Sequence, residues 1–376
     1  MTATALVGVL GSGQLGRMLA LAGYPLGLRF RFLDPAPHAP AAQVAECVEA
    51  AFDDPAALAR FAGGLSVCTY EWENVPVTTA RALEKMVAVY PPPQALEATQ
   101  DRLIEKQFFK SLGILTAPFA GIEGEPGMKK ALSTIGTPAI LKTRRMGYDG
   151  KGQARINSAQ EAADALASMK GAPCIVEGFV KFARELSVLA VRSRDGLIQF
   201  WPLAENLHEG GILRRTIAPA PNVPLELEKQ ARGFISRIMD ALNYVGVMCL
   251  EMFQVGDQLL ANEMATRVHN SGHWTIEGAH TSQFENHLRA VLGWPLGSCE
   301  ARGASIMLNL IGESPAREAV LGIPEAKLHL YGKEPRPGRK LGHITVSGAD
   351  AEHARTQFAK VCAACGSWAS AYALKA

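Results

Sequence analysis

The sequence predicts a protein of the α/β class with some α+β character, in which a doubly wound parallel sheet comes first. Two observations lead to this prediction. In the first third of the chain, short apolar runs alternate with helical patterns, as strands and helices do in a parallel sheet covered on both faces. After three prolines at 91–93, strand signals become denser and partly antiparallel, which indicates a second region of different architecture.

The individual elements follow from short apolar runs and from helical periodicity. In the first region we expect strands at 5–10, 29–33 and 65–69 and a helix from Gln14 to about Gly23. The second region opens with a helix at 101–112, and its clearest strands are 139–142, 174–177, 185–191 and 247–255. From about Gly297 the chain returns to short strands, at 304–309 and 343–346, before a helix near 350–365.

Composition and charge narrow the function classes. The chain has 376 residues, of which 48% are hydrophobic and 20% charged, so it can form two or three domains. A net charge of +2 without a long basic run gives no sign of nucleic-acid binding, and no apolar stretch is long enough for a membrane span. Seven scattered cysteines favour reduced thiols and a cytoplasmic location, and the Cys362/Cys365 pair is expected to serve packing.

A glycine-rich turn follows the first predicted strand. Gly11, Gly13 and Gly16 open the first helix, and Asp34 ends the next strand, which together match the dinucleotide-binding fingerprint. The same cradle suits any phosphate group at a helix N-terminus, and it can equally be a tight turn without a ligand. The motif alone therefore leaves three interpretations open: nicotinamide binding, phosphate binding and a structural turn.

Two glutamates lie close together on a predicted hairpin. Strands at 247–255 and 258–264 flank Gly256 and Asp257. A two-residue loop would place Glu251 opposite Asn262, whereas a loop one residue longer would place it opposite Glu263. Like charges opposed on a sheet repel each other, so a cation is expected between them, and Mg²⁺ suits oxygen ligands with room for phosphates. The alternative is a pair of solvated surface glutamates.

Polar residues follow this hairpin at unusual density. Arg267, His269 and Asn270 can hold a small oxyanion, because arginine binds carboxylate-like anions at two points and the other two side chains add donors. A polar loop held by its own hydrogen bonds is the alternative. A second polar segment, TRRMGYDGKG at 143–152, is rich in glycine and cations and follows Lys142, which ends an apolar strand. A buried lysine needs a partner, either a phosphate or a neighbouring glutamate.

Seven segments in order resemble one known family nearly from end to end. They are GQLGRM (13–18), TYEWENVP (69–76), DRLIEK (101–106), GYDGKGQ (147–153), NLHEGGI (206–212), RVHNSGHWT (267–275) and GRKLGHI (338–344). On these segments the chain resembles the 5-(carboxyamino)imidazole ribonucleotide synthetases of the ATP-grasp superfamily. The resemblance implies an ATP-grasp fold with a pre-ATP-grasp domain at 1–100, an ATP-grasp domain at 101–296 with a lid at about 115–180, and a small β-rich C-terminal domain at 297–376.

The family also implies an activity and a set of site residues. The activity is ATP- and bicarbonate-dependent carboxylation of the exocyclic amine of 5-aminoimidazole ribonucleotide, through carboxyphosphate, in purine biosynthesis. Lys142, Arg267, His269 and Asn270 would be catalytic, and Glu251 and Glu263 would ligate Mg²⁺. The implied ATP-binding residues are Arg102, Lys142, Gly147, Tyr148, Asp149, Gly150, Lys151, Gly152, Gln153, Glu177, Gly178, Phe179, Val180, Glu185, His208, Asn262 and Glu263. The implied ribonucleotide-binding residues are Gln14, Leu15, Glu73, Tyr148, Lys151, Arg267, Lys333, Arg339 and Lys340.

The resemblance further implies a homodimer in the cytoplasm and a hand-off of the product to the mutase that uses it. Three alternatives remain open: a carboxylate–amine ligase that uses another oxyacid, a nicotinamide-binding oxidoreductase and a binding protein with a retired site. Two positions depart from the family pattern. Met146 stands where relatives usually have glycine. It precedes the loop at 147–153, which the resemblance implies closes over the ATP phosphates (the lid loop), and we expect Met146 to stiffen this loop. Thr266 stands where relatives usually have proline, which we expect to loosen the approach to Arg267.

Overall fold

The N-terminal region is a four-stranded parallel sheet. The structure, a computed structural model, describes residues 4–147, 150–372 and 374. Strands β1 (Leu6–Leu10), β2 (Arg29–Asp34), β3 (Glu46–Glu49) and β4 (Val67–Tyr70) are arranged in the order β3-β2-β1-β4. Helix α1 (Gln14–Gly23) begins and ends where the sequence predicts. The edge strand β3 was not predicted, because it is short and partly exposed and has no apolar run.

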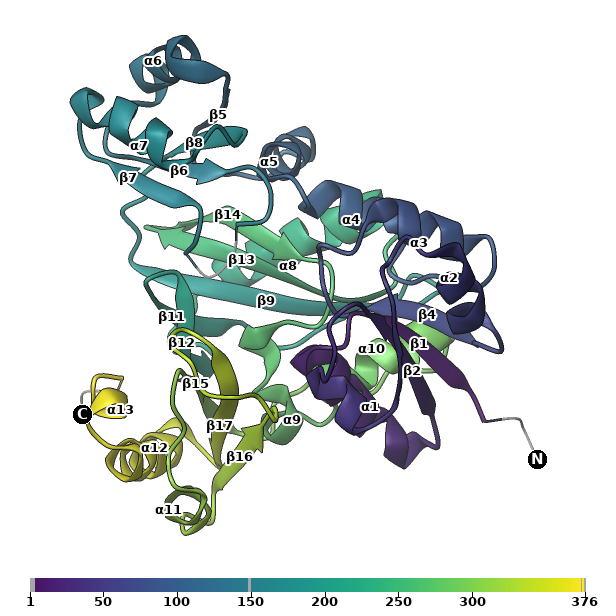
Figure 1. Cartoon of the computed structure of the whole chain (residues 1–376). Helices are drawn as coiled ribbons and strands as arrows, with labels where there is room; N and C mark the ends of the chain where they lie inside the picture. Colours follow the sequence, from purple (N-terminus) through teal and green to yellow (C-terminus); the bar gives the residue numbers. More distant parts are fainter. Residues whose placement is uncertain (1–3, 148–149, 373, 375–376) are drawn as a thin grey trace.

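A second sheet forms a separate lobe, which lies at the top of Figure 1. Helices α4 (Pro93–Thr99) and α5 (Arg102–Ser111) lead into it. Strands β5 (Phe119–Ile122), β6 (Ala139–Thr143), β7 (Gln153–Ile156) and β8 (Cys174–Gly178) pair antiparallel in the order β5-β8-β6-β7. Helices α6 (Gly124–Ile135) and α7 (Ala162–Ser168) share one hydrophobic core with this sheet. The loop between β6 and β7 is the glycine- and cation-rich segment of the sequence.

The third sheet is the largest and contains nine strands of the described chain. Its order is β14-β13-β9-β11-β12-β15-β17-β16, and β10 (Ile198–Phe200) pairs with β9. The bounds of its central strands are β9 (Arg184–Arg192), β11 (Ala204–Glu209), β12 (Ile212–Ala218), β13 (Gly246–Val255) and β14 (Gln258–Ala265). Helix α8 (Leu225–Ala241) packs on one face. The other face holds α9 (Thr275–Gly278), α10 (Gln283–Leu292) and the N-terminal region.

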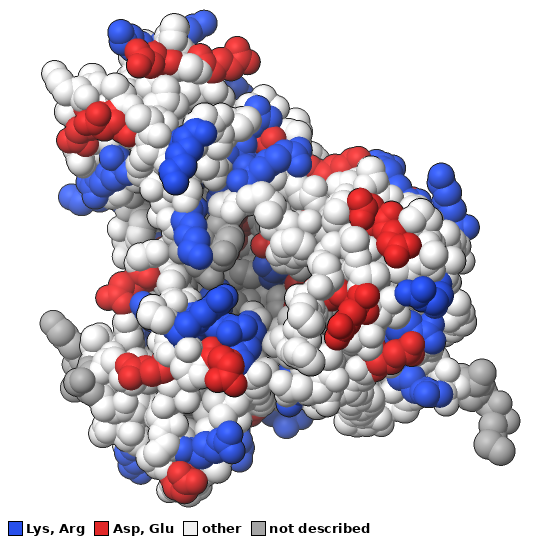
Figure 2. Space-filling view, viewed as in Figure 1, with Lys and Arg blue, Asp and Glu red and all other residues white. Residues whose placement is uncertain are grey.

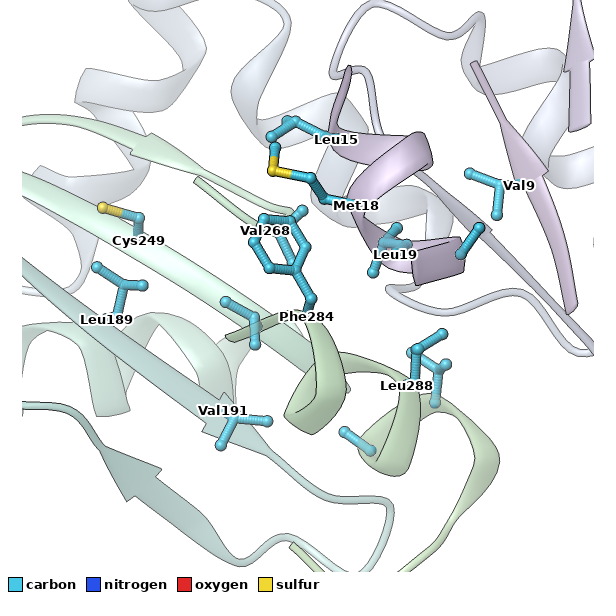
Figure 3. Close-up of a cluster of buried hydrophobic side chains, with 14 of the residues drawn as sticks. Val9, Leu15, Met18, Leu19, Leu189, Val191, Cys249, Val268, Phe284 and Leu288 are labelled. Atoms are coloured by element: carbon cyan, nitrogen blue, oxygen red, sulfur yellow. The ribbon is translucent and has the colours of Figure 1, made fainter. Parts of the chain in front are cut away.

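The N-terminal sheet is joined to the central sheet through a continuous hydrophobic core. Leu15, Met18 and Leu19 on α1 lie beside Phe284 and Leu288 on α10 in Figure 3. This core is a reason why the two regions keep a fixed relation, since burying a large apolar side chain contributes about 1.5–3 kcal/mol. A buried histidine also joins the two regions: His287 on α10 shares a hydrogen bond of 2.8 Å with Thr69 on β4 and accepts one of 3.1 Å from the backbone of Val247 on β13.

The C-terminal strands extend the central sheet and do not form a sheet of their own. Strand β15 (Ala304–Ile311) pairs with β12 and β17 (Lys340–Gly348), and β16 (Ala326–Leu330) pairs with β17. Helices α11 (Arg317–Leu321), α12 (Ala351–Cys365) and α13 (Ser367–Ser370) complete this part of the chain. Cys362 and Cys365 are buried in its core, so the packing role predicted for them is confirmed. In the described ranges, no helix is long and apolar enough to cross a membrane.

Candidate functional site

A cavity of about 570 Å³ lies where the N-terminal region, the lobe and the central sheet meet. Figure 2 shows a hollow in this face of the molecule, with lysine and arginine side chains around its rim. The predicted site residues that line the cavity are Glu73, Arg102, Lys142, Gly147, Gly150, Gln153, Phe179, Glu185, His208, Glu251, Asn262, Glu263, Arg267, His269 and Lys340. The structure therefore brings together residues that are up to 267 positions apart, from 73 to 340.

Other predicted residues lie beside the cavity and do not line it. Gln14, Leu15, Lys151, Gly152, Glu177, Gly178, Val180, Asn270, Lys333 and Arg339 belong to this group. Tyr148 and Asp149 lie outside the described residues. The side chain of Leu15 is buried in the core, where Figure 3 shows it on α1, so only its backbone is available to a ligand.

The two glutamates of the hairpin stand directly opposite each other. Glu251 on β13 pairs with Glu263 on β14, although the loop has only two residues and Val255 pairs with Gln258. The predicted link between loop length and register was wrong, because a β-bulge at Asn262 adds the missing residue within the strand. A bulge also interrupts the alternation of side chains, and Asn262 and Glu263 accordingly both line the cavity.

The carboxylate pair fits a divalent cation. Burial and the nearby charge of Glu263 raise the pKa of Glu251, with His208 acting in the opposite direction. Burial would also raise the pKa of Glu263, but the charge and hydrogen bond of Arg102, 2.8 Å away, hold it well below its usual range. Within the described part of the chain no donor reaches the buried Oδ1 of Asn262, and no three His, Cys, Asp or Glu side chains could hold a metal ion on their own. Two carboxylates and one amide oxygen suit Mg²⁺ when phosphate oxygens and water complete its shell.

Lys142 belongs to a buried cluster of charges at the lobe end of the cavity. Its Nζ lies 3.2 Å from Glu177 on β8, and Nζ of Lys106 on α5 lies 3.3 Å from the other oxygen of the same carboxylate. The ion pair that was the alternative for Lys142 is therefore present. Burial would raise the pKa of Glu177, but the two lysines lower it to about 2. Lys106 was missed, although it lies within the DRLIEK segment, because its position on the helix does not reveal its burial.

The residues expected near adenine and ribose come from the end of β8, from the segment that follows it, and from β9 and β11. Of residues 177–180, only Phe179 lines the cavity. Burial would lower the pKa of His208, but the carboxylate of Glu185, 2.6 Å from its Nδ1, raises it to about 9. Phe182 stacks on Phe253 with ring centroids 4.7 Å apart, and both rings line the cavity. This aromatic pair was also missed by the sequence prediction, yet Phe253 lies two residues after Glu251 and so on the same face of β13.

Arg267 lines the cavity, and Asn270 follows three residues later without lining it. Arg267 donates to Glu73 and, at 3.0 Å, to the carbonyl of Val268. Burial would raise the pKa of Glu73, but the charge of Arg267 holds it below its usual range. Both polar side-chain atoms of Asn270 are buried without a hydrogen-bond partner in the described chain. Since buried polar atoms are normally satisfied, these two atoms indicate room for a small polar ligand.

The predicted phosphate-binding residues lie where the C-terminal strands meet α1. Lys333 donates to the side chain of Gln14, and burial and the nearby Arg339 lower the pKa of Lys333 to about 8. Arg339 donates to the carbonyl of Glu334 at 3.2 Å, whereas Lys340 lines the main cavity. The group thus has an excess of positive charge at one edge of the cavity, which suits an anion.

The glycine-rich turn before α1 is filled by a side chain of the protein. The buried carboxylate of Glu71 accepts hydrogen bonds from the backbone N–H groups of Gly13, at 2.9 Å, and Gly16, at 3.2 Å. Asp34, the residue expected to bind a ribose, accepts from the backbone of Ser12 at 2.7 Å. The anion position of the fingerprint is therefore occupied from within, so the interpretation as a structural turn fits and the nicotinamide interpretation does not.

The lid loop approaches the hairpin between β11 and β12. Gly150 and Gly152 have positive φ angles of 76° and 69°, which favour glycine. A Cβ at Gly150 would lie 2.2 Å from the carbonyl oxygen of Gly210, and one at Gly152 would lie 2.5 Å from Oγ1 of Thr143. Met146 also has a positive φ, of 58°, and its side chain is 63% exposed. The departure noted in the sequence therefore falls on a residue whose backbone favours glycine.

Comparisons with known proteins match all three regions of the chain. Family models match at residues 4–100 (ribonucleotide synthetase preATP-grasp domain), 107–284 (ATP-grasp domain) and 305–357 (phosphoribosylaminoimidazole carboxylase C-terminal domain). The N5-carboxyaminoimidazole ribonucleotide synthase of Pseudomonas aeruginosa is 47% identical over 355 residues, which cover 94% of this chain and 98% of the relative.

Two solved structures extend this similarity to three dimensions. The crystal structure of N5-carboxyaminoimidazole ribonucleotide synthetase from Thermus thermophilus is 56% identical, with a TM-score of 0.92, and the match covers 96% of this chain and 99% of that chain. The synthase from Aspergillus clavatus in complex with ADP and 5-aminoimidazole ribonucleotide is 35% identical with a TM-score of 0.89, over 95% of this chain and 97% of that one. The chain therefore belongs to the N5-carboxyaminoimidazole ribonucleotide synthase family of ATP-grasp proteins.

Proposed function

We propose that this chain carboxylates the exocyclic amine of 5-aminoimidazole ribonucleotide with bicarbonate and ATP, and releases ADP and phosphate. One observation carries the proposal: a single cavity holds Lys142, the Glu251/Glu263 pair and Arg267. This arrangement combines a cation for phosphates, a carboxylate pair for a metal ion and a cation for a small oxyanion. The similar protein from Aspergillus clavatus was solved with ADP and 5-aminoimidazole ribonucleotide, which supports the same two substrates here.

In the first step an oxygen of bicarbonate attacks the γ-phosphorus of ATP, and ADP leaves. Lys142 neutralises charge on the transferred phosphoryl group, for which it exchanges its ion pair with Glu177 for phosphate oxygens. Glu251 and Glu263 would hold Mg²⁺ with Asn262 beside them, and the ion would supply further charge neutralisation. Catalysis of this step is mostly positioning and electrostatic stabilisation.

In the second step the ribonucleotide amine attacks the carbon of carboxyphosphate, or of the carbon dioxide derived from it, and phosphate leaves. Arg267, His269 and Asn270 hold the carboxylate group, which is consistent with the unpartnered amide of Asn270. Gln14, Lys333, Arg339 and Lys340 bind the phosphate of the ribonucleotide, and Glu73, which lines the cavity, contacts the same substrate. The lid loop excludes water that would hydrolyse the intermediate, and Lys151 and Tyr148 meet the ribonucleotide.

The test is phosphate release from ATP with Mg²⁺ and bicarbonate, measured with and without 5-aminoimidazole ribonucleotide. We expect strong release only with the ribonucleotide, together with labelled carbon from bicarbonate in an acid-labile product. Release that does not depend on the ribonucleotide would reject this amine as the acceptor. Formate in place of bicarbonate distinguishes a ligase that uses another oxyacid, and it should not support product formation.

Three further proposals rest on the family. We propose that the protein is a homodimer, that it acts in the cytoplasm and that it passes its labile product to the mutase that follows. Sedimentation equilibrium of the purified chain tests the first of these, since a monomer at micromolar concentration would contradict it. Product transfer is tested in a coupled reaction that contains the active mutase. An excess of an inactive mutase should slow the conversion of the carboxylated product only if the two enzymes bind each other.

A further inference from the structure

A chain of buried polar side chains crosses the central sheet and ends at His269. Thr216 on β12 donates to Asn206 on β11 at 2.9 Å, and Asn206 donates to Ser187 on β9 at 2.9 Å. Ser187 in turn donates to Ser271 at 3.0 Å, and Oγ of Ser271 lies 2.9 Å from Nδ1 of His269. Four hydrogen bonds thus connect Thr216 with a residue of the cavity.

The surroundings of this chain are apolar. The exposed fractions of Thr216, Ser187 and Ser271 are 0%, and that of Asn206 is 6%. Further along β9, the same face carries Leu189 and Val191, which belong to the hydrophobic core. Polar groups in such a place are costly unless they are hydrogen-bonded, and apolar residues would fill the same space at lower cost. The hydroxyl and amide groups therefore need a reason beyond packing.

The direction of the chain is fixed at its end by a backbone group. His269 caps the short 3₁₀ turn η4 (Asn270–Gly272), and its Nδ1 accepts the backbone N–H of Ser271 at 3.3 Å. A backbone N–H can only donate, so Nδ1 carries a lone pair and the ring proton is on Nε2. If every hydrogen bond of the chain ran from acceptor to donor instead, with the side-chain amide of Asn206 flipped, Nδ1 would carry a proton. That proton would point directly at the backbone N–H of Ser271.

The other ring nitrogen faces the site. Nε2 of His269 lies 3.5 Å from Oε1 of Glu251, and His269 lines the cavity together with Arg267. With the proton on Nε2, this nitrogen presents an N–H donor toward the cavity. Such a donor is suited to an oxyanion and cannot accept a proton from the substrate without a change of tautomer.

We propose that Ser271, Ser187, Asn206 and Thr216 are positioning residues that hold His269 in the Nε2–H tautomer, so that it donates a hydrogen bond to the carboxylate group of the reacting intermediate. The identity of that intermediate rests on the proposed function, whereas the tautomer does not. The group that removes a proton from the amine is then another residue or the departing phosphate, and His269 stabilises charge.

The first measurement is the tautomer of His269 in the ligand-free protein. Histidine is labelled with ¹⁵N, and the ring signals of His269 are identified by their loss in His269→Asn. We expect Nδ1 to give the signal of an unprotonated nitrogen and Nε2 that of a protonated one. The reverse assignment would overturn the proposal, and the result is independent of any activity, so a failure of the proposed function is recognised separately.

The second measurement breaks the chain at its far end with a matched pair of variants. Thr216→Val keeps the shape and removes the hydroxyl, whereas Thr216→Ser keeps the hydroxyl. We expect Thr216→Val to weaken the preference for the Nε2–H tautomer, so that a fraction of the Nδ1–H form appears although the backbone N–H of Ser271 opposes it. The same variant should lower kcat about tenfold at an unchanged KM for ATP, and Thr216→Ser should restore both properties. Ser187→Ala should have the same effect as Thr216→Val in the middle of the chain.

A control variant separates positioning from general loss of packing. Ser305 on β15 is buried and shares a hydrogen bond of 2.9 Å with Ser347, outside the polar chain. Ser305→Ala should leave kcat and the His269 signals unchanged. If Thr216→Val and Ser187→Ala lower only the thermal stability, with wild-type kcat and tautomer, the residues are structural and the proposal is wrong.

Discussion

At the scale of single residues, the site depends on charges that hold one another in place. Arg267 is paired with Glu73, Arg102 with Glu263 and Lys142 with Glu177, so these three cations already have acidic partners. Breaking a buried pair leaves an uncompensated charge, which costs more than the pair itself contributes. Each substrate must therefore displace an acidic partner from the cation that it contacts. Before the substrates bind, the ion pairs hold these charges in the cavity.

The strongest test at this scale is Arg267→Ala. We expect carboxylated product to fall by at least about a hundredfold, because removal of one oxyanion donor typically has an effect of that size. The measurement is the incorporation of labelled bicarbonate carbon into the acid-labile product. Arg289→Ala is a matched control, since Arg289 pairs with Glu285 within α10 and does not line the cavity. Normal product formation in Arg267→Ala would remove Arg267 from the anion pocket.

A second residue-scale prediction concerns Met146 and its positive φ. A left-handed backbone costs about 1–2 kcal/mol for residues other than glycine, and more for a β-branched one. We expect Met146→Val to unfold in urea with a free energy at least about 1 kcal/mol lower than Met146→Gly. Equal stabilities of the two variants would show that the loop does not keep this conformation in solution.

Much of the site could be predicted residue by residue, because charged and polar residues in apolar surroundings stand out in a sequence. The Glu251/Glu263 pair and Arg267 are of this kind. Lys106 and the aromatic pair of Phe182 and Phe253 could not be predicted, since the burial of a lysine and the stacking of two rings depend on elements that are distant in the chain. Physical proximity across the fold, and not residue type, defines these members of the site.

At the scale of elements, the bulge in β14 shows what short-range patterns leave out. The two strands and the hairpin at Gly256-Asp257 were predicted from the sequence, with the loop length left open, and the structure confirms the hairpin with a two-residue loop. The extra residue Asn262 has no signal in the pattern, yet it decides which residue faces Glu251. The joining of β15, β16 and β17 to the central sheet is a similar case, because pairing with β12 is a long-range choice.

The link between elements that His287 provides leads to a pH prediction. Burial lowers the pKa of this histidine to about 3, and its unfolded value is about 6.5, so the unfolded chain binds more protons as the pH falls. The contribution of His287 to stability is complete above pH 6.5 and is lost progressively below it, by about 1.4 kcal/mol at pH 5.5.

The measurement is the free energy of unfolding in urea at pH 7.5 and pH 5.5, for the wild type and for His287→Gln. Other buried histidines also make the stability of the wild type depend on pH. For each protein we therefore take the change in unfolding free energy between pH 7.5 and pH 5.5, and compare this change between the wild type and His287→Gln. The difference for His287→Gln should be smaller by about 1.4 kcal/mol. An identical pH dependence in both proteins would mean that burial does not lower the pKa of His287 in the folded state.

At the scale of the whole molecule, three sheets from different parts of the chain supply one cavity. The order of these regions was predicted from the sequence, whereas their closure around the cavity was not, because it depends on the packing of α1 against α10 and on α5. Ligands that contact several regions at once should stabilise the assembly of these regions. The lobe, which contributes Lys142 and the lid loop, has a hydrophobic core of its own.

We therefore expect ADP with Mg²⁺ and 5-aminoimidazole ribonucleotide each to raise the free energy of unfolding. A ligand at a hundred times its Kd contributes about 2.7 kcal/mol, and the two together should contribute at least the sum. Thermal unfolding with each ligand and with both measures this, and NADH at the same concentration is the negative control. Stabilisation by NADH, or none by the ribonucleotide, would contradict the assignment of the cavity.

The carboxylate of Glu71 in the glycine turn has a consequence for any attempt to give this domain a new ligand. Because Glu71 is part of the same chain, it is always present at the turn, and a free anion would have to displace it from the N–H groups of Gly13 and Gly16. Grafting dinucleotide-binding residues around the turn would therefore fail as long as Glu71 remains. Conversely, a glycine fingerprint in an uncharacterised sequence is informative only after the residues that end the neighbouring strands have been checked for such a tethered acid.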